Sequence, residues 1–105
     1  MQVDPIYISV DHNMTLTGMN IAGTYLNTAT ATYVLKDADG STVSGGTGTL
    51  SYVSASNGNY LGVIESTVTA LLTENARYWI EITFSQGSYQ DFRRLPVRAL
   101  YRTED

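Results

Sequence analysis

The feature that most constrains the fold is a run of alternating side chains in the C-terminal third of the chain. In "YWIEITF", every second residue is apolar: Tyr78, Ile80, Ile82 and Phe84. A period of two places these side chains on one face of a β-strand, with Trp79 on the other face. No segment shows sustained helical periodicity. The chain therefore predicts an all-β fold in which this strand buries one face.

Other segments carry the same signal, separated by turn residues. They are residues 28–43, 45–65 and 89–102. Asp-Gly at Gly40 and Asn-Gly at Gly58 are hairpin signals, because glycine tolerates positive φ. Turn residues at this spacing are typical of a sandwich or barrel, so we predict seven or eight short strands. Pro96 cannot donate a ladder hydrogen bond and predicts a last strand that is at an edge, bulged or broken there.

The N-terminal segment, residues 1–20, is predicted to be an edge. Residues 6–10 alternate and predict a first strand, which ends at Asp11-His12-Asn13. A second short piece follows to Gly18. Residues 28–102 are predicted to form the core of the fold, and the length of 105 residues predicts a single domain over residues 1–105.

A leucine six residues before Tyr78 gives a further signal. A sandwich must pass from one sheet to the other, and in a tyrosine corner the ring packs inward while its hydroxyl bonds to backbone just upstream. The corner of immunoglobulin-like and fibronectin-III-like sandwiches commonly reads Leu-x-Pro-x-(Thr or Ala)-x-Tyr. Leu72, Ala76 and Tyr78 match, whereas Glu74 stands where proline is usual. The chain thus resembles this superfamily, which implies a single Ig-like antiparallel β-sandwich with a tyrosine corner.

A narrower resemblance rests on turn and strand segments. Residues 37–43, residues 57–64, the Tyr78 strand and residues 97–102 resemble small Ig-like proteins encoded in bacteriophage structural gene clusters. That resemblance implies a virion component made in the host cytoplasm, such as a head-tail connector, tail accessory or capsid-decorating protein. It implies other virion proteins, or copies of the chain itself, as partners. It brings no catalytic residues with it.

Few residues are suited to catalysis or to holding a cofactor. The chain has no cysteine and one histidine, His12, which we interpret as an exposed turn residue. Asp37 and Asp39 imitate the opening of a calcium loop, but the closing glutamate is missing; a hairpin is the favoured interpretation and a weak surface calcium site the alternative. Glycine-rich residues 44–48 lack the lysine and helix of a phosphate loop. We therefore predict a non-enzymatic protein without cofactors.

Charge is distributed unevenly in a chain whose formal net charge is −4. Lys36 is the only lysine or arginine before residue 77, and five arginines follow. Arg94, Arg98 and Arg102 share parity and would line one face if the strand continued through Pro96. The acidic balance argues against nucleic acid, so we predict that this row contacts protein.

Trp79 is the best surface candidate, because an outward tryptophan is a common interface anchor. Two alternatives remain open: its ring could be covered by the chain's own loops, or it could stack on a sugar together with Tyr25 or Tyr52. The second alternative predicts a carbohydrate-binding module. The chain shows no signal peptide and no apolar run of about 18 residues, so we expect a soluble cytosolic product that does not enter membranes.

Overall fold

The structure is a computed structural model that describes residues 3–103, and it is all-β, as predicted. Nine strands and one short helix follow in chain order. They are β1 (Asp4–Tyr7), β2 (His12–Leu16), β3 (Asn20–Ile21), β4 (Thr24–Tyr25), β5 (Thr30–Asp37), β6 (Thr42–Tyr52), β7 (Tyr60–Ile64), α1 (Ser66–Thr69), β8 (Arg77–Gln86) and β9 (Tyr89–Leu100). The predicted hairpins around Gly40 and Gly58 and the final β8–β9 hairpin are present.

Seven strands form one mixed sheet in the order β1-β9-β8-β5-β6-β7-β2, and β3 pairs with β4 in a separate ribbon. All neighbours in the large sheet are antiparallel except β1 and β9, which run parallel with Asp4 opposite Val97. The prediction of a wholly antiparallel sheet is therefore wrong at this pair. A tight hairpin enforces antiparallel pairing, but β1 and β9 are joined by the whole intervening chain, which allows either direction.

The N-terminal segment is divided between two places, and each of its first two strands lies at an edge of the large sheet. Of its described residues, β1 lies beside β9, whereas β2 lies beside β7 with His12 opposite Ile64. The turn falls at Ser9, where φ is 63°, so His12 belongs to a strand and not to the turn. Ile8 and Met14 are both buried and are an even number of residues apart, so the apolar alternation continues across the turn. The sequence pattern therefore does not reveal the turn.

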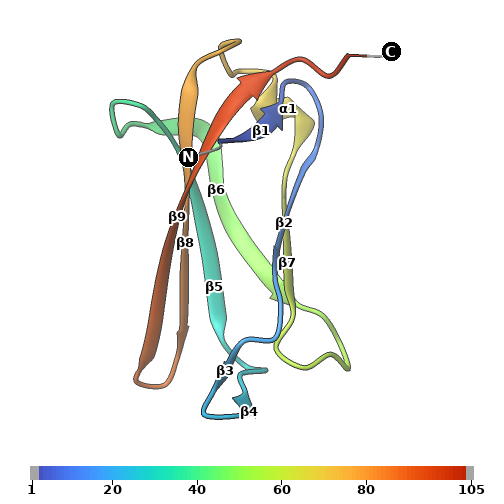
Figure 1. Cartoon of the computed structure of the whole chain (residues 1–105), viewed down its shortest axis with the longest axis vertical. Coiled ribbons are helices and arrows are strands. Elements are labelled where there is room, and N and C mark those ends of the chain that lie inside the picture. The colour runs from blue at the N-terminus through green and yellow to red at the C-terminus, as the bar shows by residue number, and fades with distance from the viewer. Residues whose placement is uncertain (1–2, 104–105) are drawn as a thin grey trace.

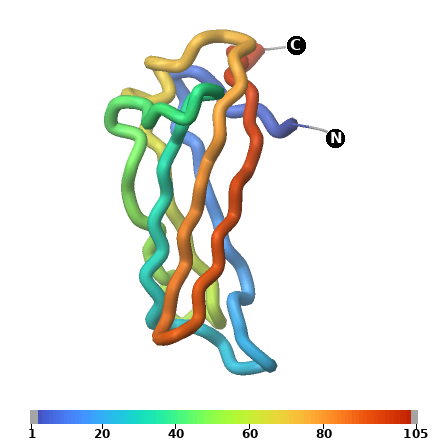
Figure 2. The backbone as a smooth tube through the Cα atoms, turned by 90° about the vertical axis from the view of Figure 1, so that its left-hand side faces the viewer, coloured from blue at the N-terminus to red at the C-terminus, as the bar shows by residue number. Residues whose placement is uncertain are grey.

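The large sheet folds over along β6. Most of β6 pairs with β5, where Ala31 lies opposite Leu50, but its last two residues pair with Tyr60 and Leu61 of β7. The result is two walls, a β5–β8–β9 wall and a β2–β7 wall, that face each other in Figure 1. The register of β5 against β6 shifts between Val34 and Lys36, so β6 is irregular there. Figure 2 shows the β5–β8–β9 wall face-on.

The core fills the space between the walls. The four side chains predicted to point inward from β8 are all buried, and they meet buried side chains of the other wall such as Met14 and Leu16. The Tyr60 ring packs edge-on against Phe84 at 5.1 Å between centroids. The Tyr60 hydroxyl donates to the Leu26 carbonyl at 2.7 Å and accepts from the Ala29 N–H at 3.0 Å, which satisfies it inside the core.

β9 runs without interruption through Pro96, which lies opposite Trp79. Of the three predicted alternatives at this proline, the structure has the edge and neither the bulge nor the break. β1 joins β9 only from Val97 onward, so no described strand requires an N–H on the free edge of β9 before that point. Over residues 89–96, β9 is therefore an edge of the described sheet.

Candidate functional site

The outer face of the β5–β8–β9 wall carries Trp79. Since Tyr78 and Ile80 point into the core, Trp79 and Glu81 point away from it. Cross-strand register places Lys36 beside Trp79 and Arg94 beside Glu81. These four side chains, from three neighbouring strands, form the centre of what we call the outer face, the surface toward the viewer in Figure 2.

Trp79 is partly covered by a neighbour from its own wall. The Arg94 guanidinium lies over the indole, 3.9 Å from the ring centroid. Arg94 Nε also pairs with Glu81 Oε2 at 3.1 Å, while Lys36 Nζ pairs with Glu81 Oε1 at 2.9 Å. The hydrogen bond from Lys36, and then the charge of both cations, lower the pKa of Glu81 below its usual value. One carboxylate therefore holds two cations around a half-buried tryptophan.

The arginine row is only partly as predicted. Arg98 follows Arg94 on the outer face and lies directly opposite Arg77, with both side chains exposed. Arg102 lies beyond the end of β9, with its guanidinium 5.2 Å from the Tyr7 ring centroid. Within residues 3–103, no ion pair involves Arg77, Arg98 or Arg102.

Basic charge is concentrated on this surface. Of the six lysine and arginine residues, five lie on the outer face or at its β1 end: Lys36, Arg77, Arg94, Arg98 and Arg102. The sixth, Arg93, lies on the inner side of β9 and pairs with Asp91 at 3.1 Å. Within the described residues of these strands, Glu81 is the acid that faces outward with them. A chain of net charge −4 thus presents a basic face.

Sequence reasoning missed Phe92 and Arg77 as parts of this face. Phe92 is 58% exposed and lies opposite Thr83, on the same side of the wall as Trp79. Both missed residues were visible in principle, because the β8–β9 hairpin register follows from its short turn and assigns every partner. Phe92 adds apolar area to the outer face on the side of Arg94 that is away from Arg77 and Arg98.

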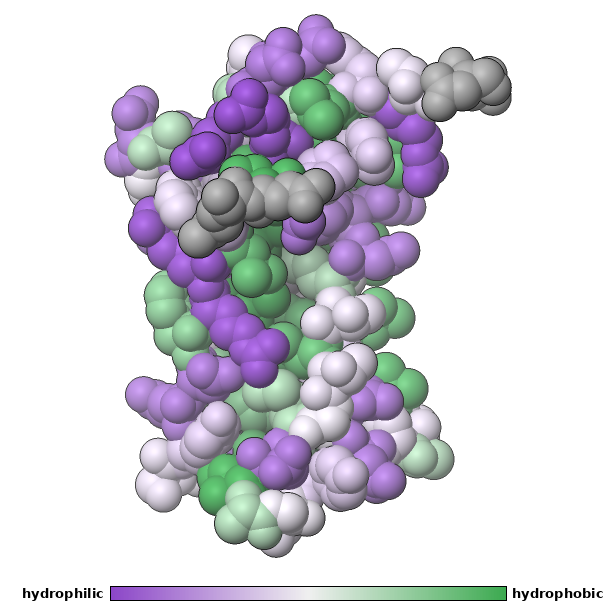
Figure 3. All heavy atoms as spheres, in the orientation of Figure 1, coloured by the Kyte–Doolittle hydropathy of each residue, from purple (hydrophilic) through white to green (hydrophobic). Residues whose placement is uncertain are grey.

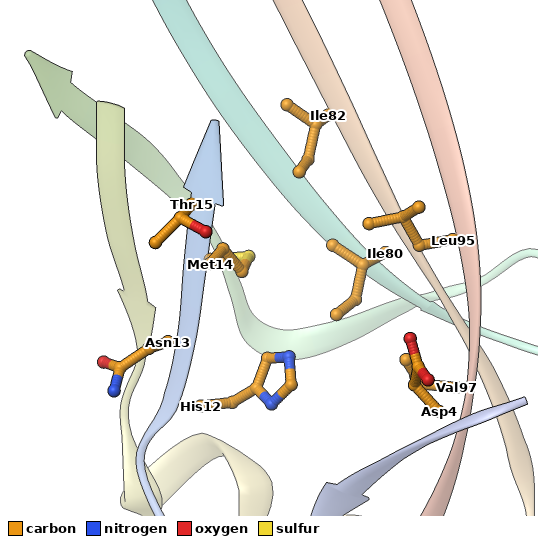
Figure 4. Close-up of a pocket in the computed structure, with 9 residues that line it drawn as sticks. All are labelled: Asp4, His12, Asn13, Met14, Thr15, Ile80, Ile82, Leu95 and Val97. Atoms are coloured by element: carbon orange, nitrogen blue, oxygen red, sulfur yellow. The ribbon is translucent and has the colours of Figure 1, made fainter. Parts of the chain in front are cut away.

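A second candidate region lies between the walls, where β2 and β9 face each other. A pocket of about 230 Å³ is lined by Met14, Ile80, Ile82 and Leu95, with His12, Val97 and Asp4 at one end (Figure 4). The prediction of an exposed turn histidine is wrong. His12 is half-buried in β2, and burial lowers its pKa, an effect that the Asp4 carboxylate partly opposes.

The corner before β8 has the hydrogen bond that the spacing predicts. The buried Tyr78 hydroxyl accepts from the Thr73 backbone N–H at 2.8 Å, and Leu72 is buried beside it. The Asn75 N–H, at a residue with φ of 69°, donates to the Ala99 carbonyl at 2.7 Å. The Tyr78 hydroxyl therefore serves to hold the backbone of this corner in place.

The Asp37–Asp39 pair lies in the β5–β6 turn. Asp37 Oδ1 accepts hydrogen bonds from the N–H groups of Asp39 at 2.9 Å and Ser41 at 3.0 Å, and Gly40 has φ of 90°. These bonds hold the turn in place. Among residues 3–103, no group of three or more histidine or acidic side chains is arranged to hold a metal ion.

The tyrosines named for the carbohydrate alternative do not join Trp79. Tyr25 is 46% exposed but belongs to β4, at the end of the molecule opposite the start of β8 (Figure 1). Tyr52 is half-buried; its hydroxyl donates to the Ser56 carbonyl and its ring packs against Tyr60. The three rings therefore form no common stacking surface.

Comparison with protein-family models, with curated proteins and with solved structures finds no match to this chain. The resemblance to Ig-like phage proteins remains a prediction. In the part of the chain that the structure describes, no helix is long and apolar enough to cross a membrane.

Proposed function

We propose that this chain is a non-enzymatic assembly module, an Ig-like β-sandwich that binds neighbouring protein subunits through its outer face in a bacteriophage virion or a similar particle. The Ig-like assignment is supported by three features of the fold. Two walls enclose one core, β2 pairs with β7 while β5, β8 and β9 pair together, and the Tyr78 hydroxyl binds backbone at the corner before β8.

The observation that carries the proposed function is the composition of the outer face. Tryptophan and arginine are among the residue types whose truncation at an interface most often causes a large loss of affinity, and the outer face carries Trp79 and several arginines. Arg77 and Arg98 stand directly opposite each other, and like charges in that position destabilise a sheet. Carboxylates from a partner would relieve this repulsion, because a guanidinium binds a carboxylate through two parallel hydrogen bonds.

The partner surface is therefore acidic, with an apolar patch to meet Trp79 and Phe92. A second copy of the chain offers carboxylates, since Asp11, Glu65 and Glu74 are exposed and belong to none of the strands β5, β8 and β9. Contact between that surface and the outer face of the next copy would be head-to-tail and would build a ring or a filament. Other virion proteins with acidic surfaces are the second kind of partner.

Light scattering with matched variants tests the proposal. The purified chain is measured alone and mixed with each product of the genes beside its own. Trp79→Ala and Arg98→Glu are expected to weaken the complex about tenfold or more. Two control variants, Tyr25→Ala and Arg93→Ala, replace an exposed ring at the other end and an arginine on the inner side, and they should leave the affinity within about threefold.

Three results would contradict the assembly function. The first is a strict monomer that binds no neighbouring gene product. The second is a tryptophan fluorescence change on a glycan panel that Trp79→Ala abolishes, which would establish the carbohydrate alternative. The third is tight, salt-sensitive binding of DNA or RNA by the arginines, which would make the outer face a nucleic-acid surface.

A further inference from the structure

The core is incompletely covered along the opening between β2 and β9. Leu95 lies opposite Ile80 and on the same side of the wall, yet Leu95 is 43% exposed and Ile80 only 1%. Farther along β9, Val97 and Ala99 are buried where β1 lies beside them. The cover therefore ends where β1 ends. Figure 3 shows the resulting strip of apolar surface between the walls, which we call the groove.

The two edges that border the groove differ in how well they resist pairing. Over its free part, β9 carries Asp91 and Arg93 on the groove side and ends in Pro96, and inward charges and proline protect an edge. β2, with the sequence HNMTL, has no proline and no lysine, arginine, aspartate or glutamate. Its one strand partner within residues 3–103 is β7. β2 is therefore the unprotected edge.

We infer that the β2 edge receives an extended segment of a partner protein by strand addition, and that the added strand covers the groove. An extended chain is the ligand that pairs with a row of backbone N–H and C=O groups. A strand beside β2 lies opposite β9, so every second side chain would point toward Leu95, Ile82 and Met14 (Figure 4). Those positions of the partner segment are apolar.

Charge defines the partner segment further. Asp4 supplies the one carboxylate among the nine side chains that line the pocket, and no ion pair of the described residues involves it. A lysine or arginine in the partner segment would meet Asp4 at the β1 end of the groove. The alternating segments of residues 3–103 are already paired in the sheet, so none of them supplies this segment. The groove lies behind the outer face, and this inference does not rest on the proposed function.

Selection from a displayed library of random peptides tests the inference on the full chain. The enriched peptides are expected to have apolar residues at alternate positions and one lysine or arginine. A synthetic copy of an enriched peptide should slow hydrogen exchange of amides within His12–Leu16, because strand addition gives free N–H groups a partner. Exchange in β5 should be unchanged.

Matched variants locate the bound peptide. Leu95→Arg is expected to weaken binding about tenfold or more, whereas Leu61→Arg, at a side chain that is 44% exposed on the far side of β7, should not. Asp4→Asn should weaken binding of the basic peptide about two- to fivefold, and Asp39→Asn should not.

The inference is overturned if no peptide is enriched, or if the enriched peptides bind equally well to Leu95→Arg. It is also overturned if a peptide binds in the groove without protecting any amide of β2. That result would mean that the pocket takes an apolar side chain but that no strand is added. Circular dichroism of Leu95→Arg establishes that the variant is folded, so that its loss of binding is interpretable.

Discussion

The Tyr78 hydroxyl holds the corner before β8 through one hydrogen bond from the Thr73 N–H. Tyr78→Phe keeps the ring and removes that bond, so we expect a loss of about 1 kcal/mol in the free energy of unfolding. Urea denaturation measures it. Tyr89→Phe is the matched control, since the Tyr89 ring packs on Phe84 and its hydroxyl makes no hydrogen bond within the described residues. Equal stability of the two variants would contradict the corner assignment.

Glu81 gives a prediction for acid stability at the same scale. Its hydrogen bond from Lys36 and the charges of Lys36 and Arg94 lower its pKa in the folded chain. The resulting stabilisation is present above the unfolded pKa and is lost as pH falls through the lower folded pKa. Glu81→Gln should therefore be less stable than the parent at neutral pH, with a gap that closes in acid. Glu74→Gln, in an exposed loop, is the control. A gap that is constant from neutral pH into acid would contradict the role of the ion pairs.

Single residues were the scale at which the sequence was most informative. The alternation from Tyr78 to Phe84 predicted which side chains are buried, because a strand between two neighbours has only two faces. It also placed Trp79 outward. The alternation could not show that Arg94 covers the indole. That contact depends on the conformation of the Arg94 side chain, which is held by its hydrogen bond to Glu81 on the neighbouring strand.

At the scale of elements, two turn glycines with similar backbone conformations face different surroundings. Gly40 and Gly58 have φ of 90° and 73°. A Cβ at Gly40 would meet open space, whereas a Cβ at Gly58 would run into the Met19 backbone, whose N–H donates to the Gly58 carbonyl at 2.9 Å. The Gly58 turn is therefore packed against the segment that precedes β3.

Alanine at these two positions separates backbone strain from collision. Gly40→Ala should cost about 1–2 kcal/mol, the price of a left-handed conformation for an L-residue. Gly58→Ala should cost about 1–3 kcal/mol more, because the Met19 backbone must move. Denaturant unfolding of both variants measures the difference. Equal losses of stability in the two variants would show that the segment before β3 moves to admit the new Cβ without lowering the free energy of unfolding.

The β3–β4 ribbon and the break after β1 were not predicted, and both depend on contacts distant in sequence. The ribbon is held from outside: the Gly18 N–H donates to Asn59 Oδ1, and the Gly58 N–H donates to Asn27 Oδ1. The turn after β1 is fixed by Thr69, whose hydroxyl donates to the Val10 carbonyl at 2.9 Å. Such bonds leave no trace in the local sequence pattern. The strands that lie between clear turn signals could therefore be predicted, whereas the β3–β4 ribbon and the turn after β1 could not.

At the scale of the whole molecule, the groove and the basic face both follow from the sheet order. The sequence predicted an arginine row, but only the β8–β9 register placed Arg77 opposite Arg98 and directed Arg93 to the other side. The groove arises because β1 covers only the last residues of β9. The sequence pattern of a single strand does not show how far a neighbouring strand extends along it. The sequence therefore supplied residues of the basic face, whereas the arrangement of that face, and the groove itself, appeared only once the walls were assembled.

His12 lies where the two walls face each other, so its titration reports on the closed fold. Burial lowers its pKa below the usual 6.5, and the Asp4 carboxylate opposes this effect. As pH falls through about 6.5, the unfolded chain binds the proton first, so the free energy of unfolding decreases until the folded pKa is reached.

His12→Gln should remove this loss, giving a free energy of unfolding that changes less than the parent's between about pH 7.5 and 5.5. Asp4→Asn should have the reverse effect: without the carboxylate the pKa of His12 falls further, and the loss becomes larger. Urea unfolding across a pH series measures all three proteins, with Asp39→Asn as the charge-matched control. Parallel pH profiles for the parent and His12→Gln would mean that His12 is as well hydrated in the folded chain as in the unfolded one, and that the walls do not close around it.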